Sequence, residues 1–165
     1  MNSYQVAVAA EAYVAAAFAQ AGCDVSVQYG ANQPGYDLIA VRGRGFLKIS
    51  VKGSQDGGWI AAGSYKEKGI SYRRALTRWQ KDHDPRMVFA FVQFSGVNFG
   101  EFPRIYFATT GEVVAHLSKA RKGNVSLILH EDHEYVRGVA AGSRDKIPDK
   151  WRLSRRRILE LFNRK

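Results

Sequence analysis

The sequence predicts an α/β fold in which helices flank a mixed central β-sheet. A segment with helical spacing of apolar residues opens the chain, a predicted hairpin follows it, and strand-like and helix-like segments then alternate to the end. The 165 residues suffice for one hydrophobic core and are too few for two ordinary domains with a linker, so we expect a single domain over residues 1–165. Hydrophobic residues make up 45% and charged residues 24% of the chain, which excludes disordered, collagen-like and coiled-coil classes.

The first predicted element is a helix over residues 4–21. Its apolar residues recur at helical spacing, and Gly22 follows as a C-terminal stop. The segment is rich in Ala but lacks the cationic start of a signal peptide and carries Glu11 in its middle. We therefore expect it to be part of the mature fold.

Three strands are expected next, where apolar and polar residues alternate. Arg42-Gly43-Arg44-Gly45 has the composition of a tight turn, which makes the two segments beside it a β-hairpin. The predicted strands cover residues 24–29, 36–41 and 46–52, with a polar loop over residues 30–35.

The second half of the chain alternates helices with strands. Residues 86–94 are almost continuously apolar, as in a strand buried on both faces. Thr109 or Thr110 is suited to cap a helix, because Glu112 lies in the first turn that follows. The predicted elements are a helix over residues 64–82 broken near Gly69, strands over 86–94, 104–108 and 124–130, and helices over 109–120 and 151–162.

Basic residues exceed acidic ones and favour a polyanionic partner. The chain carries a formal charge of +10, of which +6 lies in residues 150–165, where a basic C-terminal helix is expected. A solvated basic face on a docked terminal helix would explain the same residues, and such a face would still attract phosphates. We expect nucleic-acid contacts from two basic rows, Arg73, Arg74 and Arg78 in the middle helix and Arg155, Arg156 and Arg157 in the last one.

Cysteine content and hydropathy predict the compartment. Cys23 is the only cysteine, so the chain has no internal disulfide and suits a reducing environment. No apolar run reaches the ~18 residues that a membrane span requires. We therefore expect a cytoplasmic protein without a membrane partner.

The hairpin geometry brings three polar residues together. A two-residue turn at Gly43-Arg44 pairs Arg42 with Gly45, and the same register places Asp37 opposite Ser50. Lys52 is a diagonal neighbour of Asp37 and lies on the face of its strand that also carries Ser50. A carboxylate, a hydroxyl and an ammonium group are thus expected at one end of the hairpin.

At these residues the sequence resembles the PD-(D/E)XK nuclease superfamily, especially its restriction-endonuclease-like and Holliday-junction-resolvase-like members. The resemblance covers about residues 4–60. It rests on a helix that contains Glu11, the stretch Pro34-Gly35-Tyr36-Asp37-Leu38-Ile39-Ala40, and a strand that ends Ser50-Val51-Lys52, in the order and at roughly the spacing of the family. The resemblance implies a restriction-endonuclease-like fold and a metal-dependent endonuclease that hydrolyses phosphodiester bonds, with DNA as the expected partner.

The resemblance also implies roles for individual residues. Asp37 would bind Mg²⁺ or Mn²⁺, Lys52 would orient or polarise the attacking water, and Glu11 would add a helix-borne carboxylate to the metal site. Members that cut two strands often pair, so a homodimer is a family expectation.

Ser50 departs from the family pattern, because it stands where the second carboxylate usually lies. A metal held by one carboxylate, waters and a substrate phosphate is held weakly until nucleic acid binds. One branch of the restriction endonucleases carries Ser-x-Lys here and recruits its acid from a helix about a dozen residues downstream. Glu67, fifteen residues after Lys52, is similar in position and is the candidate for this second acid and metal ligand.

Each of these residues has a simpler structural explanation. Asp37 would accept turn hydrogen bonds at the entry of a strand, and Lys52 would be a solvated strand end. Glu11 would be an ordinary helix glutamate. Ser64-Tyr65-Lys66-Glu67 also fits a capping box, in which the Glu67 carboxylate only satisfies a backbone amide.

Two other function classes therefore stay open. A nuclease-like scaffold without its second acid would be a catalytically inactive module that binds nucleic acid or a protein. A basic structural protein without affinity for nucleic acid is the third class.

Overall fold

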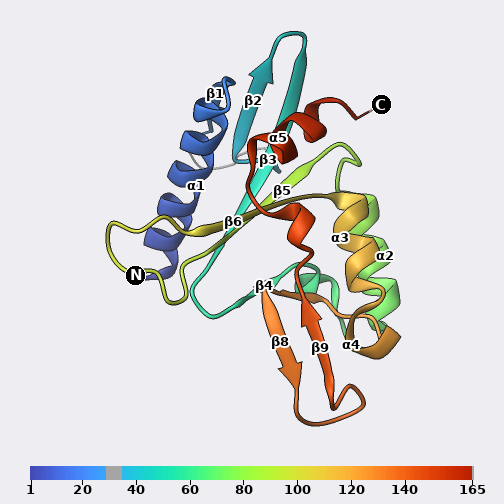
Figure 1. Cartoon of the computed structure of the whole chain (residues 1–165). Coiled ribbons are helices and arrows are strands. Elements are labelled where there is room, and N and C mark those ends of the chain that lie inside the picture. Colours follow the sequence, from blue (N-terminus) through green and yellow to red (C-terminus); the bar gives the residue numbers. More distant parts are fainter. Residues whose placement is uncertain (29–34, 165) are drawn as a thin grey trace.

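A five-stranded mixed sheet forms the centre of the chain, and helices cover both of its faces (Figure 1). The computed structural model describes residues 1–28 and 35–164. Most of the predicted loop over residues 30–35, Pro34 of the motif and Lys165 of the basic tail lie outside the described residues. The predicted α/β class, with a mixed sheet between helices, is confirmed.

The sheet has the strand order β1-β2-β3-β5-β6. Its first three strands form an antiparallel meander, β3 then pairs with β5 in parallel, and β5 pairs with β6 antiparallel. All six residues of β5 are buried, as expected for a strand covered on both faces. The strands are β1 (Asp24–Val27), β2 (Leu38–Arg42), β3 (Gly45–Ser54), β5 (Val88–Gln93) and β6 (Arg104–Thr109).

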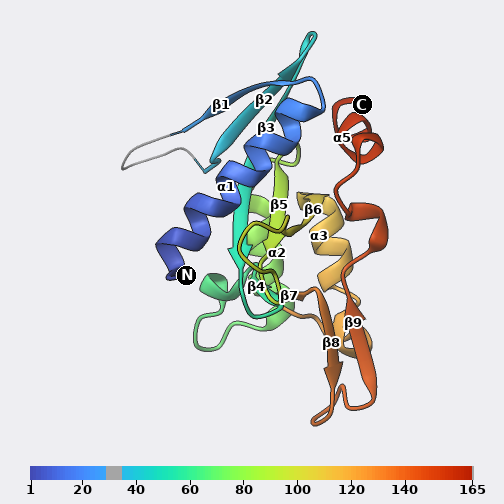
Figure 2. The same cartoon turned by 60° about the vertical axis from the view of Figure 1, so that its left-hand side comes forward.

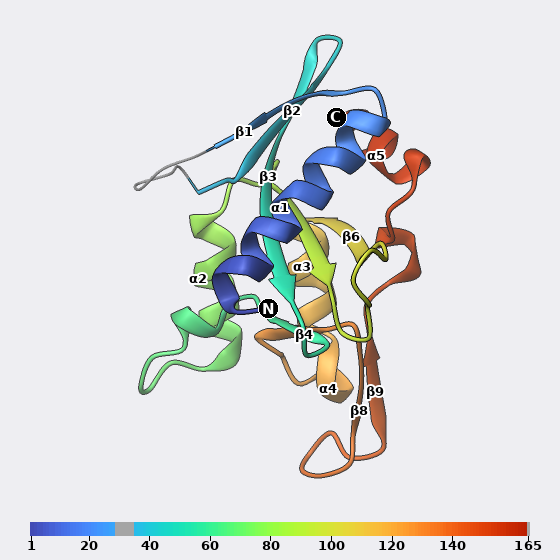
Figure 3. The same cartoon turned by 90° about the vertical axis from the view of Figure 1, so that its left-hand side faces the viewer.

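Helix α1 (Ser3–Gln20) crosses one face of this sheet (Figure 3). Asn2 caps its first turn, and Gly22 with φ +85° ends it, so the sequence predicted both ends. The face of α1 that carries Val6, Ala10 and Val14 is buried against alternate residues of the strands. Ile158 and Leu161 of the last helix, α5 (Arg155–Phe162), complete this half of the core.

The opposite face carries a second, more aromatic half of the core. Helices α2 (Tyr72–Asp82) and α3 (Thr110–Leu117) pack there on Phe89, Phe91 and Tyr106 of the sheet. Figure 2 shows α1 on one side of β3 and β5 and these helices on the other. Three buried tryptophans belong to the same cluster: Trp59, Trp79 and Trp151.

Smaller elements lie at the lower end of the view in Figure 1. Strand β4 (Gly58–Ile60) pairs with β7 (Ile128–His130), and β8 (Asp132–Tyr135) forms a hairpin with β9 (Ser143–Lys146). The remaining short elements are the 3-10 helices η1 (Gly63–Tyr65) and η2 (Asp149–Trp151) and the single turn α4 (Ala120–Gly123). In residues 1–28 and 35–164, no helix combines the length and the apolar character that crossing a bilayer demands.

The middle helix begins later than the sequence predicts. Ser71 is its N-cap and accepts a hydrogen bond from the Arg74 amide, whereas Ser64 lies in η1. Gly69, with φ +80°, separates the two segments, since few other residues adopt that conformation without strain. The predicted break near Gly69 is confirmed, whereas the expected α-helix before it is wrong, because that part forms η1 and a loop.

Candidate functional site

The β2–β3 hairpin has the predicted register. Arg42 lies opposite Gly45 and Val41 opposite Phe46, and Gly43 supplies the positive φ (+59°) that the tight turn requires. The Asp37 amide continues this ladder by donating to the Ile49 carbonyl at 2.8 Å. The local turn chemistry therefore fixes where Asp37 stands relative to β3.

The two strands separate directly after this point and form a fork. Strand β2 begins at Leu38, whereas β3 runs on to Ser54 in its pairing with β5. At the fork the Asp37 side chain continues the hydrogen bonding that the backbone of β2 makes with β3. Its Oδ2 accepts a hydrogen bond from the Val51 amide at 2.6 Å. One carboxylate oxygen is thus fixed in the fork, which holds the Asp37 side chain in a defined position.

Helix α1 brings a second carboxylate to the fork. A Cβ atom built on Gly53 would lie 2.7 Å from Cγ1 of Val6 and 3.2 Å from Cβ of Ala10, so only glycine permits this close packing of α1 on β3. Glu11 follows Ala10 directly. The close approach at Gly53 therefore sets how near the Glu11 carboxylate comes to the end of β3.

Electrostatics place Glu11, Asp37 and Lys52 in one cluster. The pKa of Glu11 is raised, mainly because burial disfavours the carboxylate and further because the Asp37 charge repels it, while Lys52 acts in the opposite direction. Two carboxylates within electrostatic range of each other favour a bound cation. The structure thus brings together the three residues on which the sequence resemblance depends.

Ser50 and Lys52 lie on the face of β3 opposite to the α1 contact. Their register partners on β5 are Phe89 and Phe91, which belong to the aromatic half of the core. Ser50 is buried and Lys52 is exposed. The side chain of Lys52 is therefore accessible from solvent, whereas the side chain of Ser50 is buried.

Glu67 does not join this cluster. Its carboxylate is 68% exposed and forms an ion pair with Arg78 at 3.4 Å, in the loop between η1 and α2. It also caps no helix, because the N-cap of α2 is Ser71. The capping-box explanation of Glu67 is therefore wrong, and the structure gives this residue a surface ion pair in place of a position beside Asp37.

The donor set at the fork suits a hard divalent cation only in part. Glu11 and Asp37 offer carboxylate oxygens, the ligand type that Mg²⁺ prefers. Within the residues that the structure describes, no three acidic, His or Cys side chains form a group able to hold a metal ion. The two carboxylates fit a cation whose remaining ligands are water and phosphate oxygens, as the replacement of the usual acid by Ser50 leads one to expect.

The predicted basic rows are only partly on the surface. Arg73 and Arg74 on α2 and Arg155 on α5 are exposed. Arg156 is exposed as well and pairs with Glu160 at 2.9 Å. These side chains are available to a polyanion. For Arg156 and Arg78, a polyanion would have to compete with their ion-pair partners Glu160 and Glu67.

Arg157 corrects the prediction for the last helix. The residue is only 7% exposed, and its guanidinium donates to the Phe107 carbonyl at 3.0 and 3.1 Å and to the Glu112 carboxylate at 2.5 Å. A buried guanidinium with these partners does not offer its charge to phosphates. Arg157 therefore stabilises the fold, and the prediction that it contacts nucleic acid is wrong.

Sequence reasoning missed the surroundings of Lys48. Its ammonium nitrogen lies 5.6 Å from the centre of the Tyr36 ring and 3.9 Å from the Asp84 carboxylate. The alternation of Lys48, Ser50 and Lys52 on one face of β3 was the available signal, but the role of Asp84, from the α2–β5 turn, depends on tertiary structure.

We compared the chain with known proteins. No family model, curated protein or solved structure matches the chain. The function must therefore be argued from the residues at the fork.

Proposed function

We propose that the protein is a metal-dependent DNA endonuclease that hydrolyses phosphodiester bonds and is related to the PD-(D/E)XK superfamily. The observation that carries the proposal is the cluster of Glu11, Asp37 and Lys52 where β2 separates from β3. A helix and an antiparallel meander build this fork, and the Glu11 helix, Asp37 and Lys52 follow one another in the chain in the order on which the family resemblance rests.

The two carboxylates would hold the cation. Asp37 is fixed through its hydrogen bond from the Val51 amide, and Glu11 approaches from α1. A bound Mg²⁺ or Mn²⁺ would supply Lewis acidity and a water of lowered pKa. Because only two protein carboxylates are present, the substrate phosphate would contribute to the affinity for the metal.

Lys52 would act on the reacting groups directly. Its exposed ammonium, on a long flexible stem, can hold the attacking water or balance the charge that develops on the phosphate. Exposed Arg73, Arg74 and Arg155 would contact phosphates away from the fork, which adds affinity without base recognition.

A second candidate function is binding of nucleic acid or a protein without cleavage. The specific observation in its favour is Ser50, which replaces an acid that the structure does not supply from Glu67. With Ser50 in place of the acid, the protein could cleave DNA with the two remaining carboxylates, or it could bind without cleaving.

A cleavage assay distinguishes the two functions. Labelled linear, nicked, single-stranded and four-way-junction DNA would be incubated with Mg²⁺ or Mn²⁺. We expect cutting by the native chain, and a loss of at least about 100-fold in the variants Asp37→Ala and Lys52→Ala, because each removes a group that acts in the reaction.

Matched controls are available on the surface. Asp24→Ala and Lys68→Ala remove exposed residues of the same types and should leave the rate unchanged. Binding without cutting in any of these DNA forms would reject the nuclease and support the binding module. Cutting that persists in both fork variants would remove the fork from the mechanism.

A further inference from the structure

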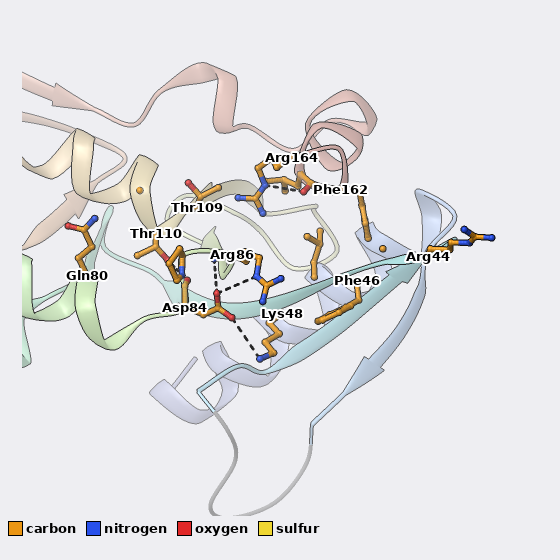
Figure 4. A pocket seen from close by; sticks show the side chains of 15 residues that line it. Arg44, Phe46, Lys48, Gln80, Asp84, Arg86, Thr109, Thr110, Phe162 and Arg164 are labelled. Carbon is orange, nitrogen blue, oxygen red and sulfur yellow. Dashed lines mark hydrogen bonds and ion pairs between the residues drawn. The ribbon is translucent and has the colours of Figure 1, made fainter.

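A cavity of about 590 Å³ lies at the hairpin-tip end of β3, away from the fork, and its size is within the usual range of ligand sites (Figure 4). Four segments distant in the sequence form its walls. They are the tip of the β2–β3 hairpin and the start of β3, the α2–β5 turn, the start of α3, and the end of α5. Its charged residues and the exposed ring are Arg44, Lys48, Asp84, Arg86, Arg164 and Phe46.

The lining is strongly basic. Arg44, Lys48, Arg86 and Arg164 contribute four cations, and Asp84 is the one acidic residue among the described lining residues. In Figure 4, Lys48 and Arg86 converge on the Asp84 carboxylate, each at 3.9 Å. Arg86 remains 88% exposed, so this contact leaves its guanidinium accessible. The cavity thus favours an anionic occupant.

The cavity also carries an exposed aromatic surface. Phe46 is 59% exposed although it lies within the hairpin, and Phe162 forms part of the opposite wall. A hydrophobic ring beside several cations is the combination by which proteins bind single-stranded nucleic acids, with bases stacked on the ring and phosphates held by the cations. Metal ions or free phosphate would not require the ring.

One face of β3 connects the cavity with the fork. Phe46, Lys48, Ser50 and Lys52 alternate along this strand and therefore point to the same side. The strand rises about 3.4 Å per residue, so the path from Phe46 to Lys52 measures about 20 Å. Lys48 links the two sites, because it contacts both Asp84 of the cavity and Tyr36, the neighbour of Asp37.

We propose that this cavity binds an unpaired nucleic-acid strand next to the phosphodiester that the fork addresses. The inference rests on the proposed function and narrows its substrate to DNA with a single-stranded segment. A paired base is stacked within the duplex, whereas an unpaired base is free to enter the cavity and lie against Phe46.

Binding would be measured in the Asp37→Asn protein with EDTA present, so that cleavage plays no part. The probes are a fluorescein-labelled oligothymidylate and a blunt duplex of the same length. We expect Phe46→Ala to weaken oligothymidylate binding at least about fivefold, since one base loses its stacking partner. Phe99→Ala is the matched control, because Phe99 is fully exposed in the β5–β6 loop, outside the cavity lining.

The salt dependence of binding tests the cationic side chains of the cavity. Arg86→Ala should lower the slope of log affinity against log salt by about 0.7 for the single strand, as expected for one lost phosphate contact. Arg137→Ala, an exposed cation in the β8–β9 hairpin, should leave that slope unchanged.

The results separate this inference from the nuclease function. Equal oligothymidylate affinities of the Phe46→Ala and Phe99→Ala proteins would overturn the cavity proposal, even if the native chain cuts DNA. Tighter binding of the blunt duplex than of the single strand would also overturn it. Phe46-dependent binding of oligothymidylate by a chain that cuts no DNA would sustain the cavity and reject the nuclease.

Discussion

Two places in the molecule bring acidic and basic side chains together, and they do so in opposite ways. In the Glu112–Arg157 pair, Arg157 also donates to a backbone carbonyl and Glu112 also accepts the Thr109 amide. Burial raises the pKa of Glu112, but the hydrogen bonds from Thr109 and Arg157 outweigh it, so the pKa is lowered. At the fork, the pKa of Glu11 is raised, first by burial and then by the nearby charge of Asp37.

The difference separates an ion pair that stabilises the fold from a cluster of like charges. Charges that stabilise a fold meet partners of opposite sign and complete hydrogen bonds, as around Arg157. Carboxylates that crowd one another oppose folding and are typical of sites at which a cation or a reacting group binds. Three substitutions test this contrast, from the largest expected effect to the smallest.

Replacing Arg157 should have the largest effect on stability. Arg157→Ala leaves the Glu112 carboxylate partly buried without its cation, and breaking a buried pair typically costs about 3–5 kcal/mol. Urea denaturation of the purified variant measures this free energy. Arg156→Ala changes the adjacent residue, which is 90% exposed, and should cost less than about 1 kcal/mol. Equal stabilities of the two variants would contradict the structural role of Arg157.

Replacing Gly53 should have an intermediate effect that reaches the fork. The added methyl group of Gly53→Ala meets Val6 and Ala10 on the rigid face of α1, and such overpacking typically costs about 1–3 kcal/mol. Because α1 must move away from β3, the Glu11 carboxylate should also lose its position beside Asp37. The measurement combines thermal denaturation with the cleavage assay.

Gly35→Ala is the control for this change, since a Cβ atom there has no neighbour within 4 Å. It should leave the melting temperature unchanged. Unchanged melting of Gly53→Ala would mean that α1 does not pack on β3 as described.

Replacing Glu11 should have the smallest effect on stability, and this substitution should stabilise the protein. A raised pKa means that folding disfavours the ionised carboxylate, so its charge lowers stability at pH values above the folded pKa. Glu11→Gln removes that charge and should raise the melting temperature slightly at pH 7 in EDTA. A lower melting temperature would indicate that Glu11 has a stabilising partner and that the fork is an ordinary ion cluster.

The sequence predicted the parts of the site that depend on local geometry. The turn at Gly43-Arg44 determines the register, and the register alone places Asp37 near Ser50 and Lys52. Helical spacing likewise predicted α1 and its end at Gly22. The electrostatic influence of Asp37 and Lys52 on Glu11 agrees with the family resemblance, although the position of α1 depends on the close packing at Gly53, which no local pattern indicates.

The remaining features depend on residues that are far apart in the chain. Ser64 and Ser71 are both suitable helix caps, and only the structure shows that the chain uses Ser71. Three arginines in succession look equivalent in sequence, but one of them must face the core when the helix docks, and Glu112 selects Arg157. The β8–β9 hairpin was not predicted, because its residues are mostly exposed and carry no apolar alternation.

The position of α5 after the other elements of its core has a consequence for synthesis. Glu11, Asp37 and Lys52 all precede β4 in the chain, whereas Ile158 and Leu161, which close the same half of the core, are made more than 100 residues later. Until α5 docks, apolar side chains of α1 and the meander stay open to water, and such surfaces promote aggregation. The cavity also gains its fourth wall only at that moment, so the nascent chain holds the fork residues before it holds a complete surface for a substrate.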